Sequence, residues 1–320
     1  MTESQMLPSD VSVLRFGCAL LPFLPSLIIR FSEHGIKDET MMPGLEIGLW
    51  CSIGYVTQAI GLSQTSPARG AFICALFLVV TPLLNGIQGR RVEAQAWVAV
   101  VTALLGTAFL EGLLPLPLLG AEAVGTRGAE IATAAMADIN VGDAWCGGTA
   151  LGFGTMFSRM EVHMEDLPEE AALPMTVWQL VTLFASCICW RLSLIDGGLG
   201  TELSSASTGA ASALHGWVAS MHENFAADAR LVPSILFMGF ISGALVLWGE
   251  TLLMKEVPST ETGVIFATEP VWAAVFAAML LHDSITQQEL VGGAAIVLAC
   301  LALQLPEERV LEAIGTRIER

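Results

Sequence analysis

Residues 263–281, GVIFATEPVWAAVFAAMLL, carry one ionisable side chain, Glu269, and a proline, Pro270, directly follows it. A bare carboxylate inside an apolar segment is costly, so Glu269 is expected to face a cavity or a partner, or to hold a proton. Pro270 donates no backbone hydrogen bond, and its ring disturbs the preceding turn. Two interpretations stay open. Glu269 lines a ligand site near its mouth, or it caps or packs a helix as a structural device.

A second acid, Glu250, lies deep in the apolar run LVLWGETLLM. Its counterpart in the first half of the chain, once one gap is allowed, is Gln58 in IGYVTQAIGL. Two long polar side chains at matching depths are expected to face one cavity, where one binds substrate and the acid binds a proton or an amine. The alternative is that Glu250 lies near a membrane interface and extends its carboxylate to water.

Two aromatic residues accompany these polar side chains. Tyr55 lies one turn before Gln58 on the same helical face, so it is either a ligand contact or a core aromatic. Trp248 has the same two interpretations with weaker support. Pro82 lies in the helix of the first half that corresponds to the helix of Pro270, and paired interrupted helices in two halves indicate a transport site.

Other charged residues in the apolar runs have structural interpretations. Arg15 and Gln179 occupy equivalent places in the two halves. Arg15 either binds an anionic substrate or anchors the end of its helix, and we favour the anchor. Arg159 and Glu161 end another run, where we expect an interfacial ion pair or a solvated helix end.

The composition requires a non-aqueous environment. Hydrophobic residues make up 54% of the 320 residues and charged residues only 14%, whereas a soluble domain has about 25% charged residues. With only 14 Lys and Arg and no basic stripe, the chain is not expected to bind nucleic acid. The histidines and seven cysteines show no metal spacing, and no nucleotide loop or nucleophile–base arrangement is readable. We therefore predict no metal, no other cofactor and no enzymatic activity.

Nine apolar runs are long enough to span a bilayer as helices, which need about 20 residues each. They cover residues 11–29, 44–62, 67–87, 94–114, 142–160, 173–192, 232–253, 262–281 and 289–305. The fold class predicted is an all-α polytopic membrane protein. Counting Lys and Arg in the connections puts the C-terminus on the positive side of the membrane, the cytosol or its organellar equivalent.

The order of the runs suggests an internal repeat. A shift of the chain by about 193 residues matches the runs 67–87 and 94–114 with 262–281 and 289–305. We predict a first repeat over 11–114, a linker over 115–141, and a second repeat over 142–305 with a long, exposed loop at 193–231. A polar tail follows at 306–320. The second repeat has five helices and the first has four, so the first repeat is expected to lack its first helix.

Four stretches resemble one family. The segments GLWCSIGYVTQAIGLSQTSPARGAFICALFLVVTPLL and VSVLRFGCALLPFLP are similar to the second to fourth helices of EamA-type transporters of the drug/metabolite transporter superfamily. The last two helices of that family, including their Glu-Pro, resemble TGVIFATEPVWAAVFAAMLLHDSITQQELVGGAAIVLACLAL. The start of the second repeat in plant and algal members looks like GDAWCGGTALGFGTMFSRME.

The resemblance implies ten helices in two inverted repeats, around a cavity that opens alternately to either side of the bilayer. The function expected is secondary transport of a small organic metabolite, and protons are a candidate driving ion. An amino acid, an amine or a neutral solute fits better than a sugar phosphate, because few cations lie inside the apolar runs. The alternative is a non-transporting subunit of a larger membrane complex. A homodimer is also open, and the algal likeness suggests a plastid membrane.

Overall fold

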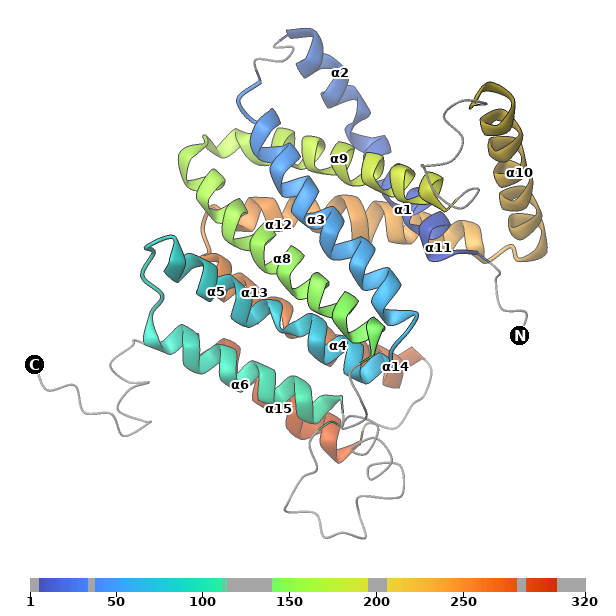
Figure 1. Ribbon diagram of the computed structural model, residues 1–320. Coiled ribbons are helices and arrows are strands. Elements are labelled where there is room, and N and C mark those ends of the chain that lie inside the picture. Colours follow the sequence, from blue (N-terminus) through green and yellow to red (C-terminus); the bar gives the residue numbers. More distant parts are fainter. Residues whose placement is uncertain are drawn as a thin grey trace, which may run out of the picture. The chain divides into compact units, whose positions relative to one another are not determined.

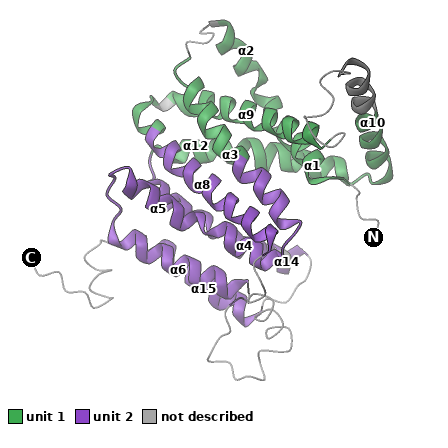
Figure 2. Ribbon diagram, in the orientation of Figure 1, with its two compact units in different colours: residues 1–52, 163–255 green, residues 53–162, 256–320 purple. Residues whose placement is uncertain are grey.

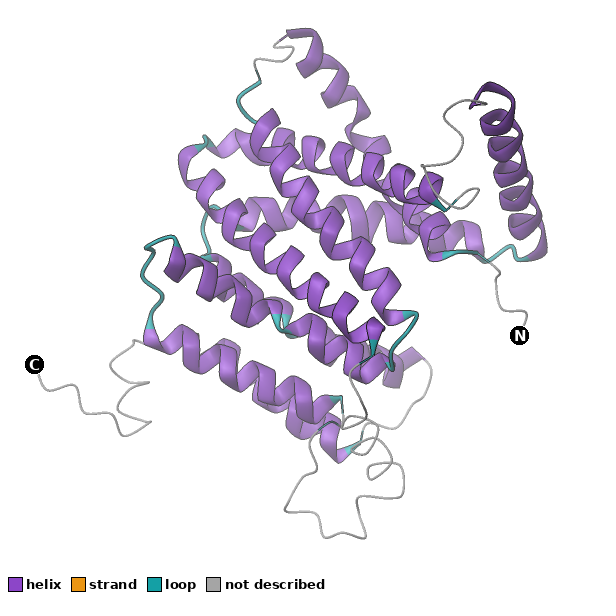
Figure 3. Ribbon diagram, viewed as in Figure 1, coloured by secondary structure: helices purple, strands orange, loops and turns teal. Residues whose placement is uncertain are grey.

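The protein is helical throughout the part of the chain that the structure describes. The computed structural model describes residues 6–33, 38–111, 113, 140–194, 206–280 and 286–303, and these residues form helices and turns without a strand (Figures 1 and 3). The predicted linker at 115–141 and the polar tail at 306–320 lie almost entirely outside the described residues. The predicted all-α fold class is confirmed.

Within the described residues, five helical segments are long and apolar enough to cross a membrane. Each agrees with a predicted span to within a few residues at either end. They are α1 (Pro8–Leu20) with η1 (Leu21–Phe23) and α2 (Leu24–Glu33); α4 (Pro67–Ala75) with α5 (Phe77–Ile87); α9 (Ala172–Ser193); α11 (Leu231–Gly239) with η4 (Phe240–Leu245) and α12 (Val246–Leu253); and α13 (Ser259–Phe266) with α14 (Glu269–Leu280). Two shorter apolar helices, α6 (Ala94–Leu110) and α15 (Gln287–Leu303), complete this apolar set.

Two further helices lie outside this apolar set. α3 (Met41–Leu62) and α8 (Val141–Asp166) lie side by side and run in opposite directions (Figure 1). Near one end His163 Nε2 lies 2.7 Å from Glu46 Oε2, and towards the other the hydroxyls of Thr57 and Thr149 share a hydrogen bond of 3.0 Å. Polar side chains on the two helices therefore face each other. Small and polar residues are common where membrane helices pack together.

The helices group into two compact units that do not follow the order of the chain (Figure 2). Unit 1 contains residues 1–52 and 163–255, and unit 2 contains residues 53–162 and 256–320. Each unit thus takes helices from both halves of the sequence, and α3 and α8 each contribute to both units. The repeat boundaries given above describe sequence order and stay a prediction.

In unit 2, two membrane-spanning segments are interrupted at matching positions. The first breaks at Leu76, between α4 and α5, and the second at residues 267–268, between α13 and α14. Pro270 is the second residue of α14, just after its break, whereas Pro82 lies inside α5, six residues beyond Leu76. The two breaks therefore correspond more closely than the two prolines do.

Helices α6 and α15 pack along each other in unit 2, and α15 begins and ends 193 residues after α6. A Cβ atom added to Gly292 would lie 2.6 Å from the carbonyl oxygen of Gly106 and 2.5 Å from the backbone nitrogen of Leu110. Glycine at this crossing lets the two backbones approach each other, as in other membrane helix pairs. Around it lies a core that includes Ala99, Ala103, Ile296 and Ala299.

The predicted exposed loop at 193–231 was wrong in one respect, because it contains the helix α10 (Ala206–Ala227). The Gly, Ser and Ala content suggested a loop, yet alanine is the strongest helix former. Trp217 and Met221 are one turn apart on α10, and Met221 is buried. The indole of Trp217 donates a 2.7 Å hydrogen bond to Asp10, which also accepts one from Arg191. These contacts attach α10 to unit 1.

Candidate functional site

The strongest candidate site is centred on Glu250, within unit 1. Glu250 lies on α12 and is 6% exposed, so its carboxylate is buried in the core of that unit. Its Oε1 atom has no hydrogen-bond partner among the described residues. A buried carboxylate oxygen without a partner carries a large desolvation penalty when charged. Such an atom is expected where an ion or a polar ligand binds during part of a functional cycle.

Four helices of unit 1 bring polar side chains to the neighbourhood of Glu250. Cys51 on α3 is fully buried, and the charges of Glu250 and Arg15 both act on its thiol. The Gln179 side chain, on α9 and also fully buried, lies within hydrogen-bonding reach of Cys51. The site therefore combines a carboxylate, a guanidinium, an amide and a thiol in one buried region.

A π-helix lies next to this site. The segment η4 (Phe240–Leu245) runs directly into α12. Such π-helical turns are rare in proteins overall, but where they occur they are often part of a functional site. Arg15 donates from Nη2 to the carbonyl oxygen and to the hydroxyl of Ser242, at 3.2 Å each. Arg15 thus joins the middle of α1 to the π-helix, a structural role that differs from the predicted anchor of its own helix end.

The remaining predicted residues are distributed over both units. Trp248 is half-buried in unit 1, near Glu250 in sequence, whereas Tyr55, Gln58 and Glu269 belong to unit 2. Tyr55 packs edge-on against Phe153, with ring centroids 5.0 Å apart, which favours a core role for this aromatic. The pairing of Gln58 with Glu250 across one cavity stays a prediction, because the two residues belong to different units.

Glu269 is the first residue of α14, and its side chain is exposed. Carboxylates at helix N-termini interact favourably with the helix dipole. The geometry therefore supports the capping interpretation of Glu269 over the ligand-binding one. The break just before it supplies the new helix start that the capping interpretation needs.

Unit 2 holds a second polar cluster that the sequence analysis missed. Glu161 lies near the end of α8 with its carboxylate largely buried, so of the two predicted alternatives the ion pair holds, with Arg90 as the partner, and the solvated helix end does not. Its Oε1 pairs with Arg90 at 2.9 Å, and its Oε2 accepts hydrogen bonds from Asn85 and from Ser259. A polar residue near the end of each apolar run was the available signal, but nothing in the sequence indicated which ends meet.

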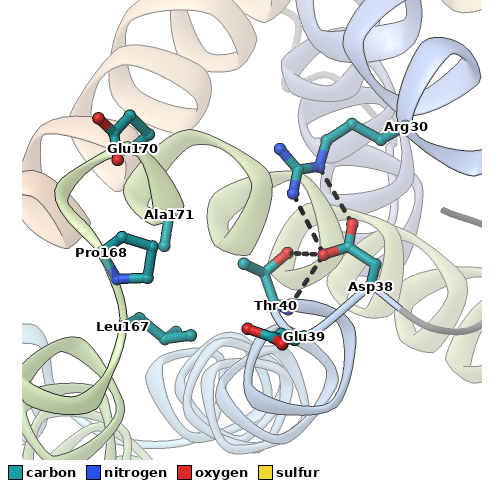
Figure 4. Close-up of a pocket in the computed structure, with 8 residues that line it drawn as sticks. All are labelled: Arg30, Asp38, Glu39, Thr40, Leu167, Pro168, Glu170 and Ala171. Atoms are coloured by element: carbon teal, nitrogen blue, oxygen red, sulfur yellow. Dashed lines mark hydrogen bonds and ion pairs between the residues drawn. The ribbon is translucent and has the colours of Figure 1, made fainter. Parts of the chain in front are cut away.

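A small cavity of about 300 Å³ lies in unit 1 at the connection between α2 and α3 (Figure 4). Arg30 binds both carboxylate oxygens of Asp38, at 3.1 and 3.2 Å, and Thr40 and Trp178 also donate to Asp38. Burial alone would raise the pKa of Asp38, but these hydrogen bonds hold the pKa well below its ordinary value of 3.8. Because Asp38 already balances the charge of Arg30, we assign this cluster a structural role.

Replacing Asp38 with asparagine is expected to lower the free energy of unfolding by about 1 to 2 kcal/mol at neutral pH. A carboxyl group whose pKa is depressed by folding stabilises the protein above its unfolded pKa, and that contribution is lost as pH falls through the folded value. The stability difference between Asp38→Asn and the parent chain should therefore shrink below about pH 4. Thermal unfolding in detergent at a series of pH values measures this stability difference. The exposed residue Glu39, changed to glutamine, provides the control variant. Equal stability of Asp38→Asn and the parent at pH 7 would contradict the assignment.

Several apolar helical spans among the described residues, with a buried acid inside one of them, define a polytopic membrane protein. The chain belongs to the EamA-like transporter family, whose sequence profile matches residues 1–111 and 144–304. It is 23% identical over 301 residues to a protein of Archaeoglobus fulgidus described as an uncharacterized transporter, and the match covers 94% of this chain and 78% of that protein. A solved crystal structure matches with a TM-score of 0.61 at 13% identity, over 96% of this chain and 90% of the other, which supports the same fold.

Proposed function

We propose that this protein is a secondary transporter that moves a small organic metabolite by alternating access, with a proton as the coupling ion. The observation that carries the proposal is the buried Glu250 carboxylate, whose Oε1 has no partner among the described residues. An acid buried inside a membrane span is characteristic of ion and proton pathways in transporters. Membership of a transporter family supports the general class of function.

Glu250 carries the proton in this proposal, and the groups around it make its two states possible. Gln179 and Cys51 are fully buried polar side chains of the same unit and carry no formal charge. Arg15, held by Ser242 of the π-helix, is a positively charged residue of the same unit. The wide π-helical turn is the element that we expect to adjust when the proton enters or leaves.

The substrate class proposed is an amino acid, an amine or a neutral solute. Gln58, Tyr55 and Trp248 remain the proposed substrate contacts, with Glu269 as a weaker candidate at the mouth of the site. The matched helix breaks and the matched helices α6 and α15 support an inverted repeat, which is the usual framework for alternating access.

Reconstitution into proteoliposomes tests the proposal. We expect a proton gradient directed into the vesicles to drive accumulation of at least one labelled amino acid, amine or neutral metabolite. Protons should enter the vesicles together with that solute. Empty vesicles and vesicles without a gradient are the controls. Failure of every class of solute, together with stable co-purification of other membrane proteins from native membranes, would instead favour the non-transporting subunit.

A further inference from the structure

A continuous hydrogen-bonded network closes one end of unit 2. Gln88 donates to the Ser158 hydroxyl at 2.9 Å, and Ser158 donates to the Asn85 side-chain oxygen at 2.6 Å. The Asn85 amide in turn donates to the Ser259 hydroxyl at 2.9 Å and to Glu161 at 3.2 Å. Arg90 completes the network with its ion pair to Glu161. Three helices, α5, α8 and α13, are thereby joined at their ends.

The same three helices are joined a second time, next to the helix breaks. Phe77 begins α5 just after the break at Leu76, and Phe266 ends α13 just before the break at 267–268. Phe157 of α8 stacks on Phe77 with centroids 5.5 Å apart and contacts Phe266 at 5.6 Å. The segments α5 and α13 therefore each run from a helix break with an aromatic contact to the polar network at the other end. They also pack against each other.

The polarity of this network is difficult to explain by stability alone. Asn85, Ser158 and Ser259 are buried, and apolar side chains of similar size would fill the same space without needing partners. Polar groups differ from apolar ones in having two acceptable environments. They are satisfied by one another when packed together and by water when separated, whereas an apolar contact becomes costly once water enters. This composition suits a contact that opens and closes.

From these observations we propose that α5 and α13 form a paired gate at this end of unit 2, hinged at the two helix breaks and latched by Glu161. Closed, the latch holds the ends of both segments against α8. Open, the two segments swing about Leu76 and residues 267–268, and water enters between them and α8. The proposal rests on the transport function given above, because a gate has a purpose only in a protein that opens to alternate sides.

Glu161 is the central residue of the latch. Both of its carboxylate oxygens accept hydrogen bonds, from Arg90 on one side and from Asn85 and Ser259 on the other. Hydrogen bonds to an ionised acceptor are about twice as strong as neutral ones. Replacing Glu161 with glutamine keeps the shape of the side chain but removes its charge. The variant is therefore expected to populate the open gate more often without losing its fold.

Thiol labelling measures the opening without any substrate. Thr262 on α13 is buried, and its hydroxyl has no partner among the described residues, so Thr262→Cys removes no hydrogen bond seen here. A water-soluble maleimide should modify this cysteine roughly tenfold faster when Glu161→Gln is present. The matched control is Asp166→Asn, an exposed acid on the same helix, which should leave the rate unchanged. Peptide mass spectrometry separates this site from the native cysteines.

Native Cys146, fully buried on α8, reports on unfolding in the same sample. Faster labelling of Thr262→Cys with Cys146 still protected supports the gate. Unchanged labelling of Thr262→Cys, or equal exposure of both thiols, overturns it.

Cross-linking gives a second, independent measurement. The pair Asn85→Cys and Ser259→Cys joins α5 to α13, and oxidation should stop uptake reversibly. The control pair Thr57→Cys and Thr149→Cys joins α3 to α8 at a similar separation and should not stop it. Retained uptake in the oxidised test pair contradicts the gate. If the parent chain shows no uptake at all, the transport function has failed, and the labelling rates still decide whether the latch opens.

Discussion

Glu250→Gln is expected to abolish uptake driven by a pH gradient, down to the level of empty vesicles, while exchange of solute across the membrane continues. Glutamine has nearly the same shape and fills the same buried site, but it binds no proton at any physiological pH. The variant therefore separates coupling from movement of the solute. A transporter that uses Glu250 only for packing would lose little, because the replacement preserves volume and hydrogen-bonding capacity.

Paired assays on the same vesicles make this result decisive. Counterflow of labelled solute measures exchange, and a pH-sensitive dye in the lumen measures proton entry. Glu256→Gln, an exposed acid six residues further along the chain, is the matched control and should behave as the parent does. If Glu250→Gln accumulates solute in response to the gradient as the parent does, Glu250 is not the coupling residue.

Gly292→Ala should be the most destabilising single methyl addition in unit 2. The new Cβ would lie 2.5 Å from the backbone nitrogen of Leu110 and 2.6 Å from the carbonyl oxygen of Gly106. Backbone atoms do not rotate away as a side chain does, so α6 and α15 must separate along their contact. Overpacking of this kind typically destabilises by about 1 to 3 kcal/mol, and we expect the upper part of that range.

The neighbouring glycine provides an unusually close control. A Cβ atom on Gly293 would meet only the Val271 side chain, at 3.5 Å, which is an ordinary contact. Alanine also favours helix over glycine by up to about 1 kcal/mol, so Gly293→Ala should be neutral or slightly stabilising. Thermal unfolding of both variants in detergent, followed by size-exclusion chromatography, compares them. Equal melting temperatures would show that α6 and α15 do not pack as described.

The number and limits of the helices were largely predictable, because a helix that faces lipid must be apolar over a length set by the bilayer. The segment 67–87 was predicted to the residue, although its break at Leu76 was not. Pro82 suggested an interruption near itself, whereas the break lies six residues earlier. The local sequence indicated that this helix is weakened. The position of the break depends on how the surrounding helices pack, which the local sequence does not show.

The buried position of Glu250 was predictable because a lone acid in a long apolar run is chemically conspicuous. Cys51 was not, since a thiol among apolar residues looks like a small hydrophobic side chain until its neighbours are known. The latch around Glu161 was missed for a related reason. Its members are polar residues near several helix ends, and each one alone resembles an ordinary interfacial residue. Only the fold brings them together.

The interleaving of the two compact units has a consequence for how the chain is made. The chain crosses from one unit to the other after residues 52, 162 and 255, so neither unit is complete until most of the protein has been synthesised. Helices α1 and α9, which pack together in unit 1, are separated by about 150 residues of sequence. Contacts of such long range form slowly. The nascent helices of the first half must therefore remain in the bilayer with incomplete partners, and the small, polar surfaces that later meet would be vulnerable to mispairing during that interval.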